Sequence, residues 1–235
     1  MSMTIEECMA ARPGRPVPDI PSNVMDQFNM KGKICVITGP SRGIGYVVAE
    51  GLAEAGAHIV NVFSSGNPAM NQKAAALAER RGVKVVNRRC DVADAQKIKS
   101  LISDICTEFG RIDVFVANAG ICIPKPILEQ TLEEFTPKMN VNVHRVFYCA
   151  KFVGAVFKEQ GYGNLIITSS ISGGVVTVPV DHITYNTTKA AVTHLGKSLA
   201  CEWREFCRVN TISPGYIDTD MSSDQAAVNE ATEWL

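Results

Sequence analysis

Several features are scarce or missing in this chain, and each absence excludes a class of protein. The formal net charge is only −1 over 235 residues, so the sequence offers no basic stripe of the kind that binds nucleic acid. No apolar run reaches the roughly 18 residues that would suggest a membrane span. Neither nucleic acid nor a membrane is therefore an expected partner. With 46% hydrophobic and 20% charged residues, we expect an ordinary soluble domain with a substantial core.

The eight cysteines contain no Cys-x-x-Cys pair, and we expect no secretory signal before the domain. Several of them fall within apolar runs, where buried thiols are common. We therefore expect reduced thiols, no metal site and a cytoplasmic protein. A disulfide between Cys201 and Cys207, or one that uses Cys8, stays open at this stage.

The amino-terminal 30 residues carry four prolines among charged residues, Pro13, Pro16, Pro18 and Pro21. Proline has no main-chain N–H group and disfavours regular structure. We expect residues 1–30 to form an extended arm and residues 31–235 to form a single domain.

From residue 33 onward, short β-branched runs alternate with longer segments rich in Ala, Glu and Lys. This alternation predicts an α/β protein of the Rossmann type, with a doubly wound parallel sheet and helices on both faces. The strands lack polar alternation, as expected where both faces are covered. Expected strands are 34–38, 58–63, 84–87, 113–117, 164–168 and 208–212. Expected helices are 43–55, 68–81, 94–109, 131–159 with a break or bend, and 183–206.

A glycine-rich turn, TGPSRGIG at residues 38–45, joins the first expected strand to the first expected helix. Glycines let the backbone approach a pyrophosphate group, which the N–H groups at a helix start can bind. The spacing Gly-x-x-x-Gly-x-Gly differs by one residue from the more familiar Gly-x-Gly-x-x-Gly, so the turn alone is weak evidence.

Tyr185 and Lys189 stand one helical turn apart in the last expected helix. This spacing places both side chains on one face, where an ammonium group can lower the pKa of a phenol from about 10. A phenol tuned in this way can protonate a reduced carbonyl group. An isolated pair of this kind is usually a solvated helix face, but its place after a glycine turn points to a nicotinamide-dependent oxidoreductase.

Further motifs follow in a fixed order: Asp91-Val92, Asn118-Ala119-Gly120, Asn142, Ser169-Ser170 and Pro214-Gly215. With these motifs the chain resembles the short-chain dehydrogenase/reductase family from residue 32 to residue 221. Within that family it looks closest to fungal sorbose, mannitol, xylulose and carbonyl reductases.

The resemblance implies a separate task for each of four catalytic residues. Tyr185 would be the general acid or base, and Ser170 would donate a hydrogen bond to the substrate oxygen. Lys189 would hold the nicotinamide ribose and lower the pKa of Tyr185, while Asn142 would position a water molecule that continues the proton relay. Ser172 is the rival for the serine role, because its separation of 13 residues from Tyr185 is common in the family, whereas Ser170 follows the strand directly.

The resemblance also implies a set of residues that bind the cofactor: Gly39, Ser41, Arg42, Gly43, Ile44, Gly45, Ser64, Ser65, Asp91, Val92, Asn118, Ala119, Gly120, Tyr185, Lys189, Pro214, Gly215, Ile217 and Thr219. The second expected strand lacks the acidic residue at its end that would take an unphosphorylated ribose. It ends in small hydroxyl residues, and Arg42 can meet an additional phosphate. We therefore predict NADPH/NADP+, although Arg42 could be solvated and a serine pair is ordinary in turns.

These observations predict an NADPH-dependent carbonyl reductase, reversible in principle, that acts on a ketose, a polyol-type ketone or a ketone of specialised metabolism. Two alternatives are a nucleotide-binding sensor or partner protein without turnover, and a non-redox enzyme on the same scaffold. By resemblance alone we expect a homodimer or homotetramer formed through residues 131–159 and 183–206.

Two further expectations concern the carboxyl-terminal region and a histidine close to Tyr185. Family members continue through a substrate-covering helix and a seventh strand, so the resemblance predicts a shortened carboxyl end at Leu235 and an uncovered sheet edge. His182, three residues before Tyr185, could reach a substrate hydroxyl group, but a histidine in a surface loop is the more frequent case.

Overall fold

The computed structural model describes residues 20–64, 69–91 and 94–223, and a six-stranded parallel sheet forms its centre. The strand order is β3-β2-β1-β4-β5-β6. The strands are β1 (Ile34–Thr38), β2 (His58–Phe63), β3 (Val85–Arg89), β4 (Val114–Ala117), β5 (Asn164–Thr168) and β6 (Arg208–Ile212). Every pairing between neighbouring strands is parallel. The structure therefore confirms the doubly wound parallel sheet.

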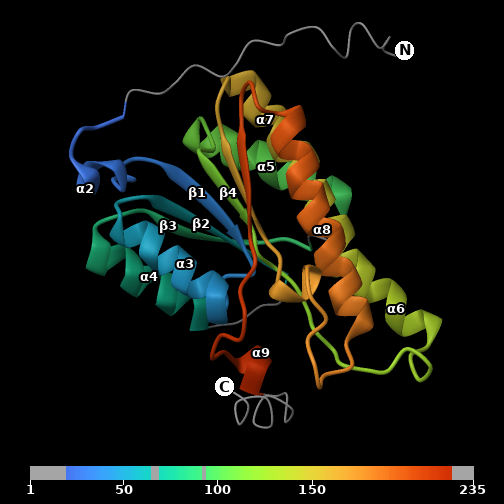
Figure 1. The fold of residues 1–235 in the computed structure, drawn as a ribbon. Helices are drawn as coiled ribbons and strands as arrows, with labels where there is room; N and C mark the ends of the chain where they lie inside the picture. The colour runs from blue at the N-terminus through green and yellow to red at the C-terminus, as the bar shows by residue number, and fades with distance from the viewer. Residues whose placement is uncertain (1–19, 65–68, 92–93, 224–235) are drawn as a thin grey trace, which may run out of the picture.

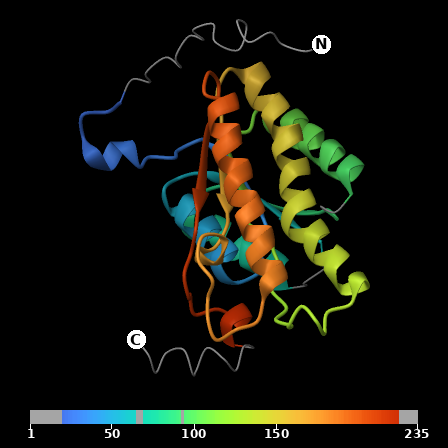
Figure 2. The same cartoon turned by 45° about the vertical axis from the view of Figure 1, so that its right-hand side comes forward.

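Helices cover both faces of the sheet (Figure 1). One face carries α3 (Gly43–Glu54) and α4 (Ala69–Arg81), and the other carries α5 (Ala95–Phe109), α7 (Arg145–Gln160) and α8 (Ile183–Glu202). Figure 2 shows α7 and α8 side by side on that second face. Alternate residues of β1 enter the two cores, since Cys35 packs beneath α3 while Val36 faces α5 and α7. No helix in the described ranges is long and apolar enough to cross a membrane.

The described part of the amino-terminal arm contains a helical turn, α2 (Val24–Gln27). The Asn23 side chain caps this turn by accepting a hydrogen bond from the Met25 N–H group at 2.9 Å. The extended conformation expected for the arm is therefore wrong at α2. The boundary of the domain at residue 31 stays a prediction.

The helix expected at 131–159 is interrupted by a π-helical segment, Asn140–His144, between α6 (Leu132–Met139) and α7. The break predicted from the sequence is therefore present. A π-helical turn inserts an additional residue into the helix and is frequent at functional sites. Here it contains Asn142, whose side chain is almost fully buried.

Two element boundaries differ by more than one residue from those expected. Strand β3 continues through Arg89, because its backbone pairs with β2 as far as Phe63. Helix α8 ends at Glu202, where Trp203 closes the helix and packs against Gly154 of α7. Any Cβ atom at position 154 would lie 2.5 Å from the indole ring, so this contact requires glycine.

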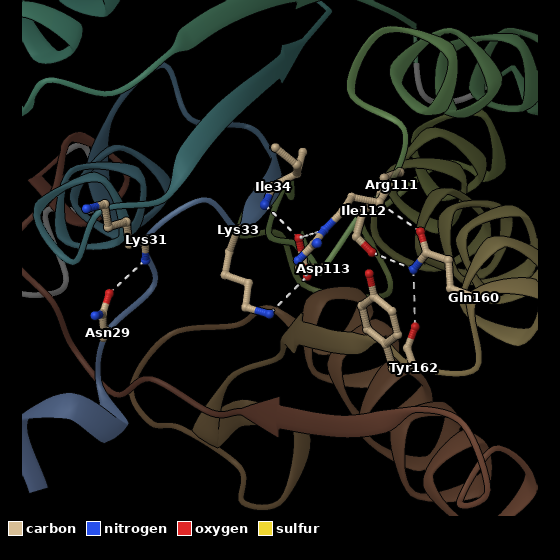
Figure 3. Close-up of polar contacts among 9 residues, drawn as sticks. All are labelled: Asn29, Lys31, Lys33, Ile34, Arg111, Ile112, Asp113, Gln160 and Tyr162. Carbon is tan, nitrogen blue, oxygen red and sulfur yellow. Dashed lines mark hydrogen bonds and ion pairs between the residues drawn. The ribbon is translucent and has the colours of Figure 1, made fainter. Parts of the chain in front are cut away.

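An ion-pair network holds the sheet at the end where the strands begin (Figure 3). The carboxylate of Asp113, 5% exposed, accepts hydrogen bonds from the Ile34 N–H group at 2.8 Å and from the Arg111 guanidinium at 2.6 and 2.9 Å. Lys33 lies 3.4 Å from the same carboxylate. Burial alone would raise the pKa of Asp113, but these donors and charges outweigh it and hold the pKa below its ordinary value.

Replacing Asp113 with alanine is expected to lower the free energy of unfolding at pH 7 by about 2 kcal/mol, because a buried N–H group loses its acceptor. The depressed pKa means that the contribution of Asp113 is complete above about pH 3.9, the value of an unfolded aspartate, and is lost as pH falls through the folded-state pKa. Urea unfolding at pH 7 measures the effect. Asp104→Ala, at an exposed position on α5, should change stability little, and an equal loss in both variants would contradict the prediction.

The cysteines agree with reduced thiols. No two of the described cysteines form a disulfide, and this includes Cys201 and Cys207. Burial raises the pKa of the Cys35 and Cys149 thiols to about 12, which makes them unreactive. Cys8 lies outside the described residues.

Candidate active site

A cavity of about 490 Å³ opens where the parallel strands end. In open α/β sheets this edge is where ligands bind. The cavity is lined by segments that follow β1, β2, β4, β5 and β6. It brings together most of the site residues expected from the sequence: Gly39, Ser41, Arg42, Gly43, Ile44, Gly45, Ser64, Asn118, Ala119, Gly120, Ser170, Tyr185, Lys189, Pro214, Gly215, Ile217 and Thr219.

The turn between β1 and α3 has the geometry of an anion-binding site. Gly39 adopts φ +69°, and a Cβ atom at Gly45 would lie 2.4 Å from the Gly39 carbonyl oxygen, so the turn is too tight for side chains there. Arg42 precedes α3 without capping it through its side chain, and the first turn of α3 contains no acidic residue. The N–H groups at the start of α3 can therefore receive phosphate oxygens. This part of the cavity fits a dinucleotide.

The segment after β4 is fixed to the glycine turn by hydrogen bonds. The hydroxyl group of Thr38 accepts from the N–H groups of Asn118 and Ala119 at 3.0 and 3.1 Å. The amide group of Asn118 donates to the carbonyl oxygens of Thr38 and Gly39 at 3.2 and 3.3 Å. These bonds hold both walls of the cavity at a set distance, which prepares the site before any ligand binds.

The charged end of the cavity carries Arg42 and Ser64. The Arg42 side chain is exposed and lies 3.5 Å from Asp220, a weak ion pair in water that a phosphate group can replace. Asp91 lines an adjoining depression that shares Ser64 with the cavity. Ser65 and Val92 were also expected at this site, and both lie outside the described residues.

Ser170 and Tyr185 form a polar pair inside the cavity. The hydroxyl oxygen of Ser170 accepts a hydrogen bond from the N–H group of Ser172 at 3.2 Å, which fixes its position at the end of β5. Burial raises the pKa of Tyr185, whereas a hydrogen bond with Ser170 lowers it and the nearby Cys122 raises it further. The balance leaves a phenol that keeps its proton at neutral pH.

Lys189 lies beneath Tyr185 and is almost completely buried. Its ammonium group donates to the carbonyl oxygen of Thr168 at 2.8 Å and lies 5.4 Å from the centroid of the Tyr185 ring. Burial lowers the pKa of Lys189 to about 8, while Cys122 raises it slightly. The sequence suggested that the ammonium group would lower the pKa of Tyr185. Burial instead has the largest effect and raises that pKa, because both groups are removed from water.

Asn142 does not line the cavity but lies behind it. Its amide group donates to the Ile121 carbonyl oxygen at 2.9 Å and to the Thr188 hydroxyl group at 3.1 Å, and its oxygen accepts from the Ile121 N–H group at 2.9 Å. Asn142 thus links the segment after β4 to the helix that carries Tyr185 and Lys189. A water-positioning role stays a prediction.

Some cavity residues were missed by the sequence reasoning, including Thr168 and Arg145. Thr168 ends β5, and its position one residue before the serine pair could have indicated it. Arg145 begins α7 directly after the π-helical segment, whose form the sequence did not indicate.

The structure is that of a dinucleotide-binding α/β protein, with a parallel sheet and a glycine turn. Its cavity also contains a serine, a tyrosine and a lysine, the side chains expected in the active site of an oxidoreductase. A family model described as enoyl-(acyl carrier protein) reductase matches residues 39–235. The chain belongs to the short-chain dehydrogenase/reductase family.

Similar proteins agree with this assignment. A probable NADP-dependent mannitol dehydrogenase of Yarrowia lipolytica is 42% identical over 209 residues, which cover 88% of this chain and 74% of that protein. The sorbose reductase of Candida albicans is 45% identical over 208 residues, with 87% and 73% covered. The crystal structure of an NADPH-dependent 3-quinuclidinone reductase from Rhodotorula rubra superposes with a TM-score of 0.87 at 43% identity, covering 92% of this chain and 81% of that chain.

Proposed function

We propose that this protein is an NADP(H)-dependent carbonyl reductase, reversible as an alcohol dehydrogenase, that acts on a ketose or another polyol-type or specialised-metabolite ketone. The observation that carries the proposal is the pairing of Ser170 with a protonated Tyr185 in a cavity whose other end fits a dinucleotide. The names of similar proteins, which include NADP-dependent dehydrogenases and an NADPH-dependent reductase, support the same chemistry.

In the proposed reaction each of these residues has a separate role. When bound, NADPH supplies the hydride that reduces the carbonyl carbon. Ser170 and Tyr185 donate hydrogen bonds to the carbonyl oxygen, where negative charge develops. Tyr185 then gives its proton to that oxygen, and in the oxidative direction it takes the proton back. Lys189 would hold the ribose of the bound cofactor beside Tyr185, and Asn142 keeps the helix with both residues in position.

The proposed cofactor preference depends on Arg42, which we place beside the additional phosphate of NADPH with Ser64. Arg42→Ala is expected to lower the ratio of kcat/KM with NADPH to kcat/KM with NADH by about 10- to 100-fold, since it removes hydrogen bonds to a charged group. Steady-state kinetics with both cofactors measure this ratio. Arg204→Ala, at an exposed position after α8, should leave the ratio unchanged, and an unchanged ratio in Arg42→Ala would contradict the assignment.

The proposed function is tested by NADPH oxidation with a panel of sorbose, fructose and 3-quinuclidinone, alongside oxidation of mannitol and sorbitol with NADP+. Turnover of at least one ketone supports the proposal. Tight NADPH binding without oxidation would favour a nucleotide-binding sensor, and conversion of a substrate without NADPH consumption would favour non-redox chemistry.

We also infer, from family membership, a homodimer or homotetramer that uses α7 and α8. Phe147 of α7 is 50% exposed, which fits a covered surface in an assembly. Sedimentation of only a monomer would contradict this inference.

A further inference from the structure

A chain of three buried side chains lines the cavity beside Tyr185 and has no part in the chemistry described above. Ser172, Thr177 and His182 are each less than 10% exposed. The Thr177 hydroxyl oxygen lies 2.5 Å from His182 Nε2 and 3.3 Å from the Ser172 hydroxyl oxygen. The His182 ring meets the Tyr185 ring edge to face, with centroids 5.6 Å apart. The histidine expected in a surface loop is therefore buried at the active site.

The surroundings of His182 determine where its proton lies. Burial lowers the pKa of His182, although Asp181 raises it, so the ring is neutral at pH 7. The Nδ1 atom is buried and has no hydrogen-bond partner within the part of the chain that the structure describes. A buried N–H group without an acceptor costs more free energy than a buried lone pair without a donor. The proton is therefore on Nε2, the nitrogen that faces Thr177.

This tautomer fixes which group donates in each hydrogen bond between the three side chains. His182 Nε2–H donates to the Thr177 hydroxyl oxygen. Within the described residues, Ser172 is the one other hydrogen-bond partner of the Thr177 hydroxyl group, so Thr177 donates its own proton to the Ser172 oxygen. Because the Ser172 oxygen accepts from Thr177, the Ser172 O–H group has no acceptor among the three side chains and is directed to another acceptor. Its main-chain N–H group meanwhile positions Ser170. The last donor of the chain therefore stands next to the serine that binds the reacting oxygen.

We propose that Ser172, aligned by Thr177 and His182, is a specificity-determining residue that donates a hydrogen bond to an oxygen atom on the carbon next to the substrate carbonyl. This inference rests on the proposed function and gives its substrate class more exactly as α-hydroxy ketones, the group that ketoses contain. A simple ketone leaves the Ser172 donor without an acceptor, and a site built for a hydroxyl group discriminates against substrates that lack one.

The inference is tested with hydroxyacetone and butanone, two ketones with the same number of non-hydrogen atoms that differ only in a hydroxyl or a methyl group next to the carbonyl. The parent protein should prefer hydroxyacetone in kcat/KM. Ser172→Ala removes the last donor but keeps the main-chain N–H group, and Thr177→Val breaks the chain with little change in shape. Each variant should lower the hydroxyacetone to butanone ratio by about 10-fold, the effect of one lost hydrogen bond. Thr187→Val, at an exposed site on α8, is the matched control and should leave the ratio unchanged.

A spectroscopic measurement tests the direction of the chain without turnover. ¹⁵N NMR of histidine-labelled protein, with His182→Gln to assign the signals, should show a neutral ring protonated at Nε2. Two results would overturn the inference and leave the reductase proposal standing. One is an unchanged hydroxyacetone to butanone ratio of kcat/KM in Ser172→Ala and Thr177→Val, and the other is a proton on Nδ1. Absence of NADPH oxidation with every ketone would overturn both, and so the two failures can be told apart.

Discussion

Replacing Tyr185 with phenylalanine is expected to lower kcat for ketone reduction by about 1000-fold, within the range found for the loss of a general acid. The change removes only the hydroxyl group, so the ring keeps its contact with His182 at a centroid distance of 5.6 Å. NADPH affinity should stay within about threefold, because a single lost neutral hydrogen bond has a modest effect. Stopped-flow kinetics and NADPH fluorescence titration measure the two quantities separately.

The same burial that raises the pKa of Tyr185 explains why this residue suits the proposed role of general acid. A phenol that holds its proton at neutral pH is ready to donate when negative charge develops on the substrate oxygen, and Ser170 shares that charge. Tyr162→Phe is the matched control, because Tyr162 lies at the opposite end of the sheet (Figure 3). Activity above about one tenth of the parent in Tyr185→Phe would mean that another group supplies the proton.

Much of the fold could be predicted because strands buried on both faces are continuous apolar runs. For this reason β1, β2, β5 and β6 have the predicted bounds. The end of β3 was missed because Arg88 and Arg89 look like loop residues, whereas backbone pairing with β2 continues through them. The π-helical form of the segment around Asn142 was missed for a similar reason. It accompanies hydrogen bonds to Ile121 and Thr188, which are distant in sequence.

Candidate site residues could be named where a motif fixes the local backbone, whereas contacts made by a loop that folds back could not be predicted. The glycine turn and the helical spacing of Tyr185 and Lys189 both depend on near neighbours in the sequence. His182 depends on Thr177, which reaches it across a loop and closes a buried polar chain. No pattern of alternation or spacing reports such a contact. The direction of the pKa change at Tyr185 could not be predicted from the sequence either, because it depends on burial in the folded protein.

Replacing Lys189 with methionine is expected to abolish most turnover and yet stabilise the protein at pH 7. The Lys189 side chain is 5% exposed, and burial lowers its pKa from 10.5 to about 8. Such a depression corresponds to a cost of about 3 kcal/mol for keeping the charged form in the folded state. Methionine fills a similar volume without charge, although it leaves the Thr168 carbonyl oxygen without its donor, which offsets about 1 to 2 kcal/mol. The expected net gain in the free energy of unfolding is about 1 to 2 kcal/mol.

The pH dependence separates this cause from a general packing effect. Below pH 8 Lys189 is charged in both the folded and unfolded states, so the parent protein carries the full cost. Between about pH 8 and 10.5 the folded protein releases the proton while the unfolded chain keeps it, and the stability of the parent rises with pH through this group. The advantage of Lys189→Met should therefore be largest at pH 7 and become smaller by pH 10, as measured by urea unfolding. Lys197→Met, exposed on the same helix, should show neither effect. A loss of stability in Lys189→Met at pH 7 would mean that the hydrogen bond to Thr168 outweighs the cost of the buried charge, and that the active-site lysine is also a stabilising element of the fold.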